Sequence, residues 1–164
     1  MPNMTTSVPQ LLKEDVQQLD RVLRELLKQT DATTVLIIDK GGFLISHQGD
    51  AGQFDLTTIA ALASGAYMAN QTIANLVHET NFNSVYQQGE KFSMFVVCVD
   101  EHCLLAAIFS AQLSVGVVKY FAAPAVEKIA RQLRVAQKRA PSAGFDLSML
   151  NVADTENIFR KKEA

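Results

Sequence analysis

VLIIDKGGFLISHQGD, residues 35–50, is the clearest structural signal in the chain. Two apolar runs, 35–38 and 43–45, flank the loop DKGG at 39–42. A glycine in such a loop supplies the positive φ that a tight hairpin requires. The stretch therefore predicts two short antiparallel strands joined by a turn.

The segments on either side extend this hairpin into a longer order of elements. Apolar residues recur at helical spacing before and after it, and three further strand-like runs follow. The predicted order is α-β-β-α-β-β-β-α, which is an α+β fold with one five-stranded antiparallel sheet between helices. The predicted helices are 11–27, 55–79 and 118–133, and the three later strands are 85–89, 92–99 and 104–109.

The chain divides into a domain at 8–139 and a linker with a tail at 140–164. The stretch APSAG at 140–144 is typical of a linker. The tail beyond it is apolar enough that we expect a partner or the domain itself to hold it. Inside the domain, Pro124 either opens the last helix or kinks a helix that begins near Ser114.

Composition excludes several classes of protein. The chain has 164 residues, of which 48% are hydrophobic and 20% charged, and its formal net charge is −2. Such a balance fits one globular domain and argues against a general nucleic-acid binder. The first residues lack the basic and apolar regions of a signal peptide, and no apolar run reaches the ~18 residues of a membrane span. We therefore expect a cytoplasmic protein.

The sequence carries no motif for catalysis or phosphate binding. The patterns G-x-x-x-x-G-K-[ST], G-x-G-x-x-G and G-x-S-x-G are all absent. Cys98, His102 and Cys103 are one ligand short of a zinc site, although the two thiols could lie opposite one another across two strands. We expect buried structural thiols, with a metal or redox role as the alternative, and surface positions for His47 and His78. No cofactor is predicted.

The second helix is the most informative segment, because residues 56–77 contain no Asp, Glu, Lys or Arg. A helix face in contact with solvent normally carries charge, whereas depletion of charge marks the centre of a protein interface. We predict that one side packs in the core and another binds a protein; the alternative is a helix enclosed within its own domain. The predicted core stripe is Ile59, Leu62, Ala66, Ile73, Leu76 and Val77, and the predicted binding stripe is Ala61, Gly65, Met68, Thr72 and Asn75.

The strand predicted at 85–89 has no charged residue to guard it until Glu90 and Lys91. An unguarded edge strand either aggregates or pairs with a copy of itself. Edge pairing beside an uncharged helix suggests a two-fold homodimer. The residues predicted at the dimer interface are Val85, Tyr86, Gln87, Gln88 and Gly89 of the strand, with Ala69 of the helix.

Residues 11–137 resemble the roadblock family, whose founding member is a dynein light chain. The resemblance rests on the hairpin at 35–50, on LTTIAALASGAYMAN at 56–70, on SVYQQGEKFSMFVVCVDEHCLLAAIF at 84–109 and on SVGVVKYFAAPAVEKIARQL at 114–133. It implies a homodimer with a ten-stranded sheet formed by pairing the third strand. It also implies that paired second helices form a platform for a Ras-like small GTPase.

Bacterial members of this kind are implied to activate GTP hydrolysis by rearranging the GTPase's own catalytic residues, with no inserted arginine and no active site of their own. Their implied setting is cell polarity and motility, with concentration at a cell pole. Carried over by position, the binding stripe and the adjacent Ser64 would face the GTPase. The implied tail contacts are Val152, Ile158 and Phe159.

Two other functions remain open from the sequence. A structural adaptor would use the same uncharged helix without accelerating hydrolysis. A small-ligand sensor of related shape would need a concave pocket with convergent polar groups.

Overall fold

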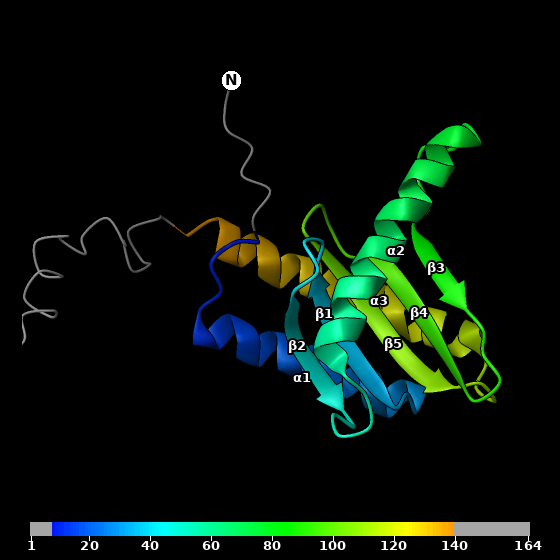
Figure 1. Ribbon diagram of the computed structural model, residues 1–164. Helices are drawn as coiled ribbons and strands as arrows, with labels where there is room; N and C mark the ends of the chain where they lie inside the picture. Colours follow the sequence, from blue (N-terminus) through cyan, green and yellow to red (C-terminus); the bar gives the residue numbers. More distant parts are fainter. Residues whose placement is uncertain (1–7, 140–164) are drawn as a thin grey trace, which may run out of the picture.

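The computed structural model describes residues 8–139. Its elements occur in the predicted order, and Figure 1 shows them in three layers, with the sheet between one helix on one face and two on the other. The α+β class and the element order are confirmed. The elements are α1 (Lys13–Thr30), β1 (Thr34–Asp39), β2 (Leu44–Gly49), α2 (Leu56–Leu76), β3 (Ser84–Gln87), β4 (Phe92–Cys98), β5 (Cys103–Ser110) and α3 (Val115–Gln137).

The five strands are ordered β2-β1-β5-β4-β3, and every neighbouring pair is antiparallel. The early hairpin therefore joins the later three-stranded meander through the β1–β5 pair. As predicted, β3 lies at an edge. It ends at Gln87, so Gln88 and Gly89 belong to the turn that follows rather than to the strand.

Two of the three interior strands, β1 and β5, bury side chains on both faces. Alternate residues of a strand point to opposite faces, so each strand contributes to two cores. The core under α1 and α3 includes Leu19, Leu23, Val35, Ile37, Phe109, Ile129 and Leu133, and the core under α2 includes Leu36, Ile38, Ala60, Tyr67, Leu104 and Ala106.

The last helix is continuous through Pro124. It begins at Val115, and the Ser114 side chain accepts a hydrogen bond from the Gly116 N–H at 3.2 Å. A serine in this position satisfies one of the free N–H groups of the first turn. Of the two alternatives left by the sequence, the helix that begins near Ser114 is the correct one.

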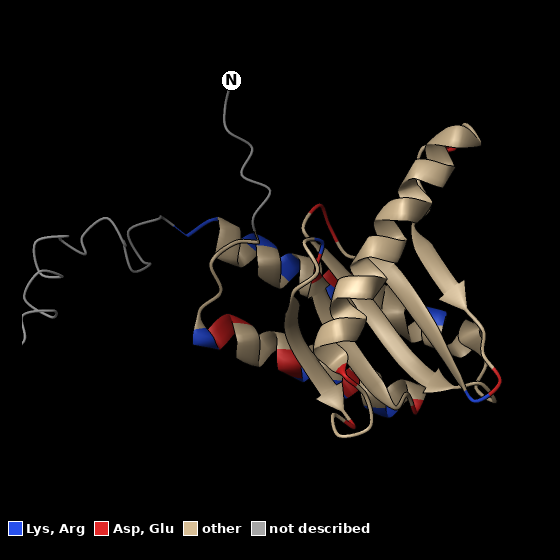
Figure 2. Cartoon of the chain, viewed as in Figure 1, with Lys and Arg blue, Asp and Glu red and all other residues tan. Residues whose placement is uncertain are grey.

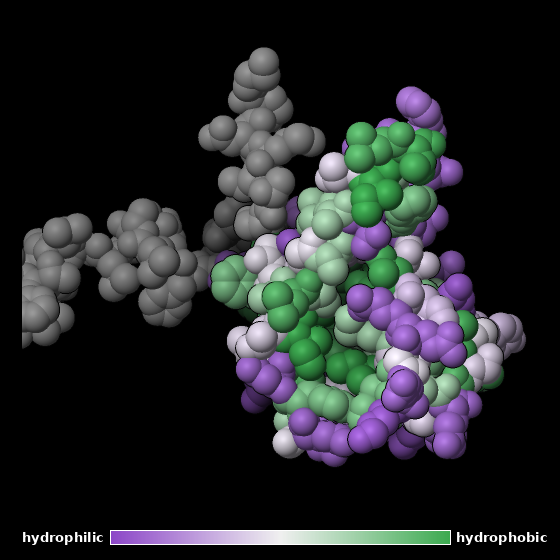
Figure 3. Space-filling view, turned by 45° about the vertical axis from the view of Figure 1, so that its right-hand side comes forward, coloured by the Kyte–Doolittle hydropathy of each residue, from purple (hydrophilic) through white to green (hydrophobic). Residues whose placement is uncertain are grey.

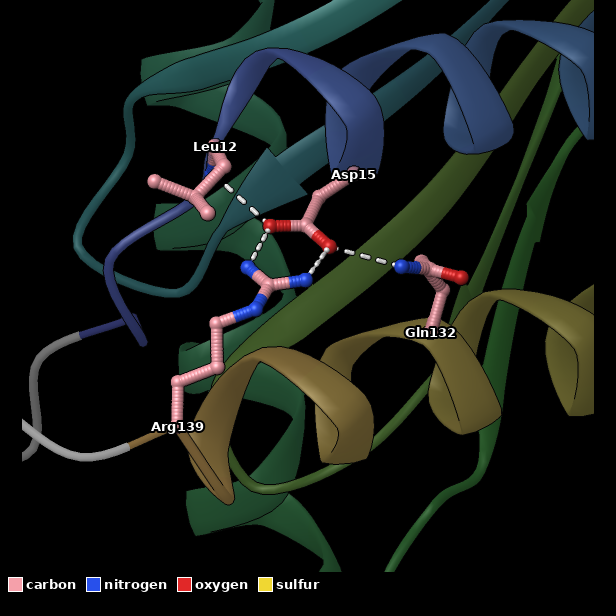
Figure 4. Close-up of polar contacts among 4 residues, drawn as sticks. All are labelled: Leu12, Asp15, Gln132 and Arg139. Atoms are coloured by element: carbon pink, nitrogen blue, oxygen red, sulfur yellow. Dashed lines mark hydrogen bonds and ion pairs between the residues drawn. The ribbon is translucent and has the colours of Figure 1, made fainter. Parts of the chain in front are cut away.

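A buried polar cluster joins the start of α1 to the end of α3 (Figure 4). The carboxylate of Asp15 is fully buried and forms a two-pronged ion pair with the Arg139 guanidinium. It also accepts hydrogen bonds from the Leu12 N–H and the Gln132 amide, both at 2.7 Å. The Arg139 hydrogen bonds are the main cause that lowers the pKa of Asp15 to about 2. The chain therefore leaves α3 at a fixed point beside α1.

Candidate protein-interaction site

The side of the second helix that packs on the sheet carries mostly small residues. Asp55 begins the helix, since its carboxylate accepts from the Thr58 N–H at 3.1 Å. Three of the five buried apolar side chains of α2 are alanine, and the large ones are a leucine and a tyrosine. The buried apolar residues of the helix are Leu56, Ala60, Ala63, Tyr67 and Ala74.

The core stripe predicted for this helix is wrong. Leu62, Leu76 and Val77 are 68%, 75% and 59% exposed, and Ile73 is also exposed. Of the six predicted residues, Ile59 and Ala66 alone are half-buried. The prediction followed side-chain size, whereas the face of α2 that packs on the sheet is mostly small residues, and several of the larger ones lie outside.

The predicted binding stripe lies on the surface of the protomer. All five of its residues are exposed, and we call them the uncharged face: Ala61, Gly65, Met68, Thr72 and Asn75. A Cβ atom added at Gly65 would meet no atom within 4 Å, so packing inside this chain does not require glycine there. Figure 2 shows no charged residue along α2. Among residues 8–139, no helix has the length and hydropathy of a membrane span.

Ser64 lies beneath the helix rather than on the uncharged face. It is 3% exposed, and its hydroxyl donates to the Lys40 carbonyl oxygen at 2.6 Å. The same hairpin turn includes Gly42 at φ 99°, where a Cβ atom would lie 3.3 Å from the Ala61 Cα atom. Ser64 and Gly42 therefore hold α2 against the first hairpin, and Ser64 has an internal structural partner.

The last turns of α2 extend past the end of the sheet, beyond the start of β3 (Figure 1). The 21 residues of the helix span about 31 Å, whereas the seven residues of β4 span about 23 Å. The helix ends where His78 adopts a left-handed conformation at φ 60°. This exposed end carries apolar side chains, green in Figure 3, and we call it the overhang: Ile73, Leu76 and Val77.

An apolar groove lies between the first turns of α2 and the turn after β3. Its volume is about 490 Å³. The groove is at the far end of β3 from the overhang. Phe54 packs edge-on against Phe92 in its wall, with ring centroids 5.2 Å apart. The side chains that line it are mostly apolar and include Phe54, Ile59, Leu62, Phe92 and Met94.

Strand β3 pairs with β4 along one side and presents its other side unpaired within the described chain. Val85 packs in the core under α2, whereas Tyr86 stacks on Phe109 on the opposite face at 6.3 Å. Gln87, Gln88, Gly89 and Ala69 are exposed. A Cβ atom at Gly89 would lie 2.2 Å from the Phe92 carbonyl oxygen, so the turn after β3 requires glycine.

The two thiols do not face one another. Cys98 pairs with Leu104 across the β4–β5 hairpin, so the two cysteines are offset by one residue. Cys103 lies in the core under α1 and α3, and Cys98 packs on the α2 side. Burial raises the pKa of the Cys103 thiol to about 12. His102 is half-buried beside Glu101, and no cluster of three metal-ligating side chains occurs among residues 8–139.

The other two histidines differ from one another in exposure. His78 is exposed, as predicted, and it terminates α2. His47 is half-buried in β2, and its Nδ1 atom is buried with no hydrogen-bond partner among the described residues. The tail residues Val152, Ile158 and Phe159 lie outside the described residues.

The profile of a known domain family fits this chain. The Roadblock/LC7 domain matches residues 18–109, from within α1 to the end of β5. The chain belongs to the Roadblock/LC7 domain family. The predicted resemblance is therefore confirmed, and the uncharged face and the open β3 edge described above lie within the matched residues of this chain.

Solved structures of MglB proteins are similar to this roadblock chain. An MglB with a tetrameric arrangement is 30% identical, with a TM-score of 0.75 over 79% of this chain and 98% of that chain. The gliding protein MglB of Thermus thermophilus is 30% identical, with a TM-score of 0.72 over 78% and 97%. Myxococcus xanthus MglB is 28% identical, with a TM-score of 0.69 over 72% and 96%. No curated protein sequence matches the chain.

Proposed function

We propose that this roadblock protein is a homodimeric activator of GTP hydrolysis by a bacterial Ras-like small GTPase of the MglA type. The observation that carries the proposal is the uncharged, exposed face of α2 on a fold shared with MglB structures. A regulatory role in a small-GTPase system agrees with these neighbours. Cell polarity, motility and concentration at a cell pole belong to the same proposal.

The dimer would form by antiparallel pairing of two β3 edges about a two-fold axis normal to the sheet. Such an axis exchanges the two ends of β3. It would therefore bring the overhang of each protomer, at the start of β3, onto the apolar groove of the other, at the end of β3. Both surfaces are apolar and exposed in one protomer, which supports this pairing.

The two uncharged faces would then lie on the same side of a ten-stranded sheet and form one platform. The GTPase would contact Ala61, Gly65, Met68, Thr72 and Asn75, while Ser64 supports the helix from below. The uncharged face has no arginine to insert into the partner's active site. Activation would therefore depend on tighter binding of the GTPase conformation in which its own catalytic residues are aligned.

The decisive experiment is single-turnover GTP hydrolysis by a Ras-like GTPase of the same genome, with and without this protein. We expect a large acceleration. Met68→Arg should abolish it, because the platform would bury an unpaired charge. Val117→Arg is the matched control, since Val117 is 45% exposed on α3 and Met68 is 49% exposed. Equal acceleration by wild type and Met68→Arg would remove the uncharged face from the binding site.

An adaptor that binds the GTPase without activating it is the second candidate. The absence of charge on α2 agrees with either role, because both need a surface that excludes water. Equal affinity for the GDP and GTP forms, with no change in hydrolysis rate, would establish the adaptor. Preference for the GTP form would favour the activator.

A further inference from the structure

The layer on the opposite side of the sheet carries a second groove, between α1 and α3. Its volume is about 350 Å³. We call it the helix-pair groove, and its lining comes equally from the two helices and includes Arg21, Val22, Glu25, Lys128, Arg131 and Val135. Past Glu25 and Lys128 it continues into a smaller depression walled by Phe121 and Pro124.

The helix-pair groove combines apolar surface with positive charge. Val135 is 47% exposed on its wall, and Val22 is half-buried in its floor. Lys128 is paired with Glu25 at 2.9 Å, whereas no carboxylate among residues 8–139 forms an ion pair with Arg21 or Arg131. The groove therefore suits a segment that is both apolar and acidic.

The chain itself contains such a segment. Residues 145–159 read FDLSMLNVADTENIF, with three acidic residues and no basic residue. By contrast, residues 115–139 contain six basic residues and one acidic residue. The charges of the segment and of the α3 side of the groove are therefore opposite.

The path of the chain makes this segment available to the groove. Arg139 is held against Asp15, and Gln132 contributes both to that polar cluster and to the groove lining. Val135 lies one helical turn, about 6 Å, before Arg139. The linker at 140–144 spans at most about 18 Å, so the segment at 145–159 begins within reach. Attachment to the same chain also gives the segment an effective concentration in the millimolar range.

We propose that residues 145–159 dock into the helix-pair groove of their own chain. Val22 and Val135 contact the apolar residues of the segment, and Arg21 and Arg131 pair with its carboxylates. In this position the tail residues Val152, Ile158 and Phe159 lie on the face opposite the uncharged face of α2. Docking would therefore withhold them from a GTPase on the platform. The inference does not depend on the proposed GTPase activity.

The test uses the full chain with a photoreactive benzoylphenylalanine at Val135. After irradiation, mass spectrometry should find cross-links from position 135 to residues 145–159. The same experiment is done on an equal mixture of unlabelled and ¹⁵N-labelled chains, combined before assembly. The two peptides of each cross-linked product should then be either both unlabelled or both labelled, because the segment docks on its own chain. The same probe at Arg134, an exposed neighbour outside the groove, should give a yield lower by roughly tenfold. Products of mixed isotope, or no cross-link to 145–159, would overturn the proposal.

Reversing the charge of the two arginines of the groove is the second test of the proposal. Arg21→Glu with Arg131→Glu should lower the cross-linking yield by roughly tenfold, because two attractions become repulsions. Arg24→Glu with Arg134→Glu is the matched control, since it makes the same charge change on the same helices outside the groove. Circular dichroism establishes that both variants are folded. An equal loss in the two variants would also overturn docking in this groove.

Discussion

The two helical layers of this protein cover the same sheet in opposite ways. The α2 layer has no charged residue between 56 and 77, and it exposes large apolar side chains. The α1–α3 layer buries large apolar side chains such as Leu19, Leu23, Ile129 and Leu133 and closes with the Asp15–Arg139 ion pair, although α3 also exposes Tyr120 and Val135. The core of the α1–α3 layer is built from large side chains, whereas the core side of α2 is mostly small and its large apolar side chains lie on the surface.

The largest expected effect tests the α2 layer. Leu76→Asp places a charge in the overhang, and we expect it to weaken the homodimer at least ~100-fold, because a carboxylate cannot enter an apolar groove unpaired. Tyr120→Asp on α3 is the control, since Tyr120 is 74% and Leu76 75% exposed. Sedimentation over a concentration series measures both. Dimers of equal affinity in the two variants would mean that the overhang is not part of the interface.

The second prediction tests the α1–α3 layer. Asp15→Ala should lower the free energy of unfolding by about 2–3 kcal/mol, because it removes a buried ion pair and the bond to the Leu12 N–H. Glu25→Ala, which removes the exposed pair with Lys128, should cost less than about 1 kcal/mol. Urea unfolding at one protein concentration compares them. Similar losses would show that the Asp15 cluster contributes no more than a surface pair.

Lowering the pH should remove the stabilisation that the Asp15 carboxylate contributes. The pKa of Asp15 is about 2 in the folded state against an ordinary 3.8, so its stabilisation is complete above pH 4 and is lost as pH falls towards 2. The difference in unfolding free energy between wild type and Asp15→Asn should shrink by about 2 kcal/mol over that range. Urea unfolding at several pH values measures the difference. A gap that stays constant down to pH 2 would contradict this assignment.

The smallest effect separates packing within the chain from packing against a partner. Gly65→Ala should raise protomer stability by about 0.5–1 kcal/mol, because alanine favours a helix and its Cβ atom meets no neighbour in this chain. The same methyl group should weaken GTPase binding, since it lies on the proposed platform. Urea unfolding and a binding titration measure the two effects. A gain in stability with unchanged binding would exclude Gly65 from the contact.

The sequence predicted the order of elements and the edge position of β3, because hydrophobic period and turn residues are local signals. It also predicted a helix at 118–133, and Val118, Ile129 and Leu133 of this segment are buried on α3. The core side of α2 could not be predicted in the same way. Because every residue of α2 is uncharged, periodicity does not identify its inner face, and here that face consists mostly of small residues.

Contacts between residues far apart in the sequence could not be predicted either, because no local pattern indicates them. Asp15 and Arg139 are 124 residues apart, and nothing near either residue indicates that they pair. Ser64 follows the buried Ala63 and precedes the exposed Gly65, and its hydroxyl donates to the Lys40 carbonyl oxygen on the first hairpin, a contact that no local pattern indicates. The relative position of the two thiols depended on the register of β4 and β5. A shift of one residue puts them on opposite faces of the sheet.

Because the end of α2 is exposed in a single protomer, the survival of a newly made chain would depend on the concentration of the protein. A protomer alone exposes Leu76, Val77 and an unpaired strand edge, which are the features that chaperones and proteases recognise in incompletely assembled proteins. If the proposed homodimer covers these surfaces, a chain below the concentration at which two copies meet would be removed by quality control. The overhang would therefore set a lower limit on the amount of protein that a cell can keep.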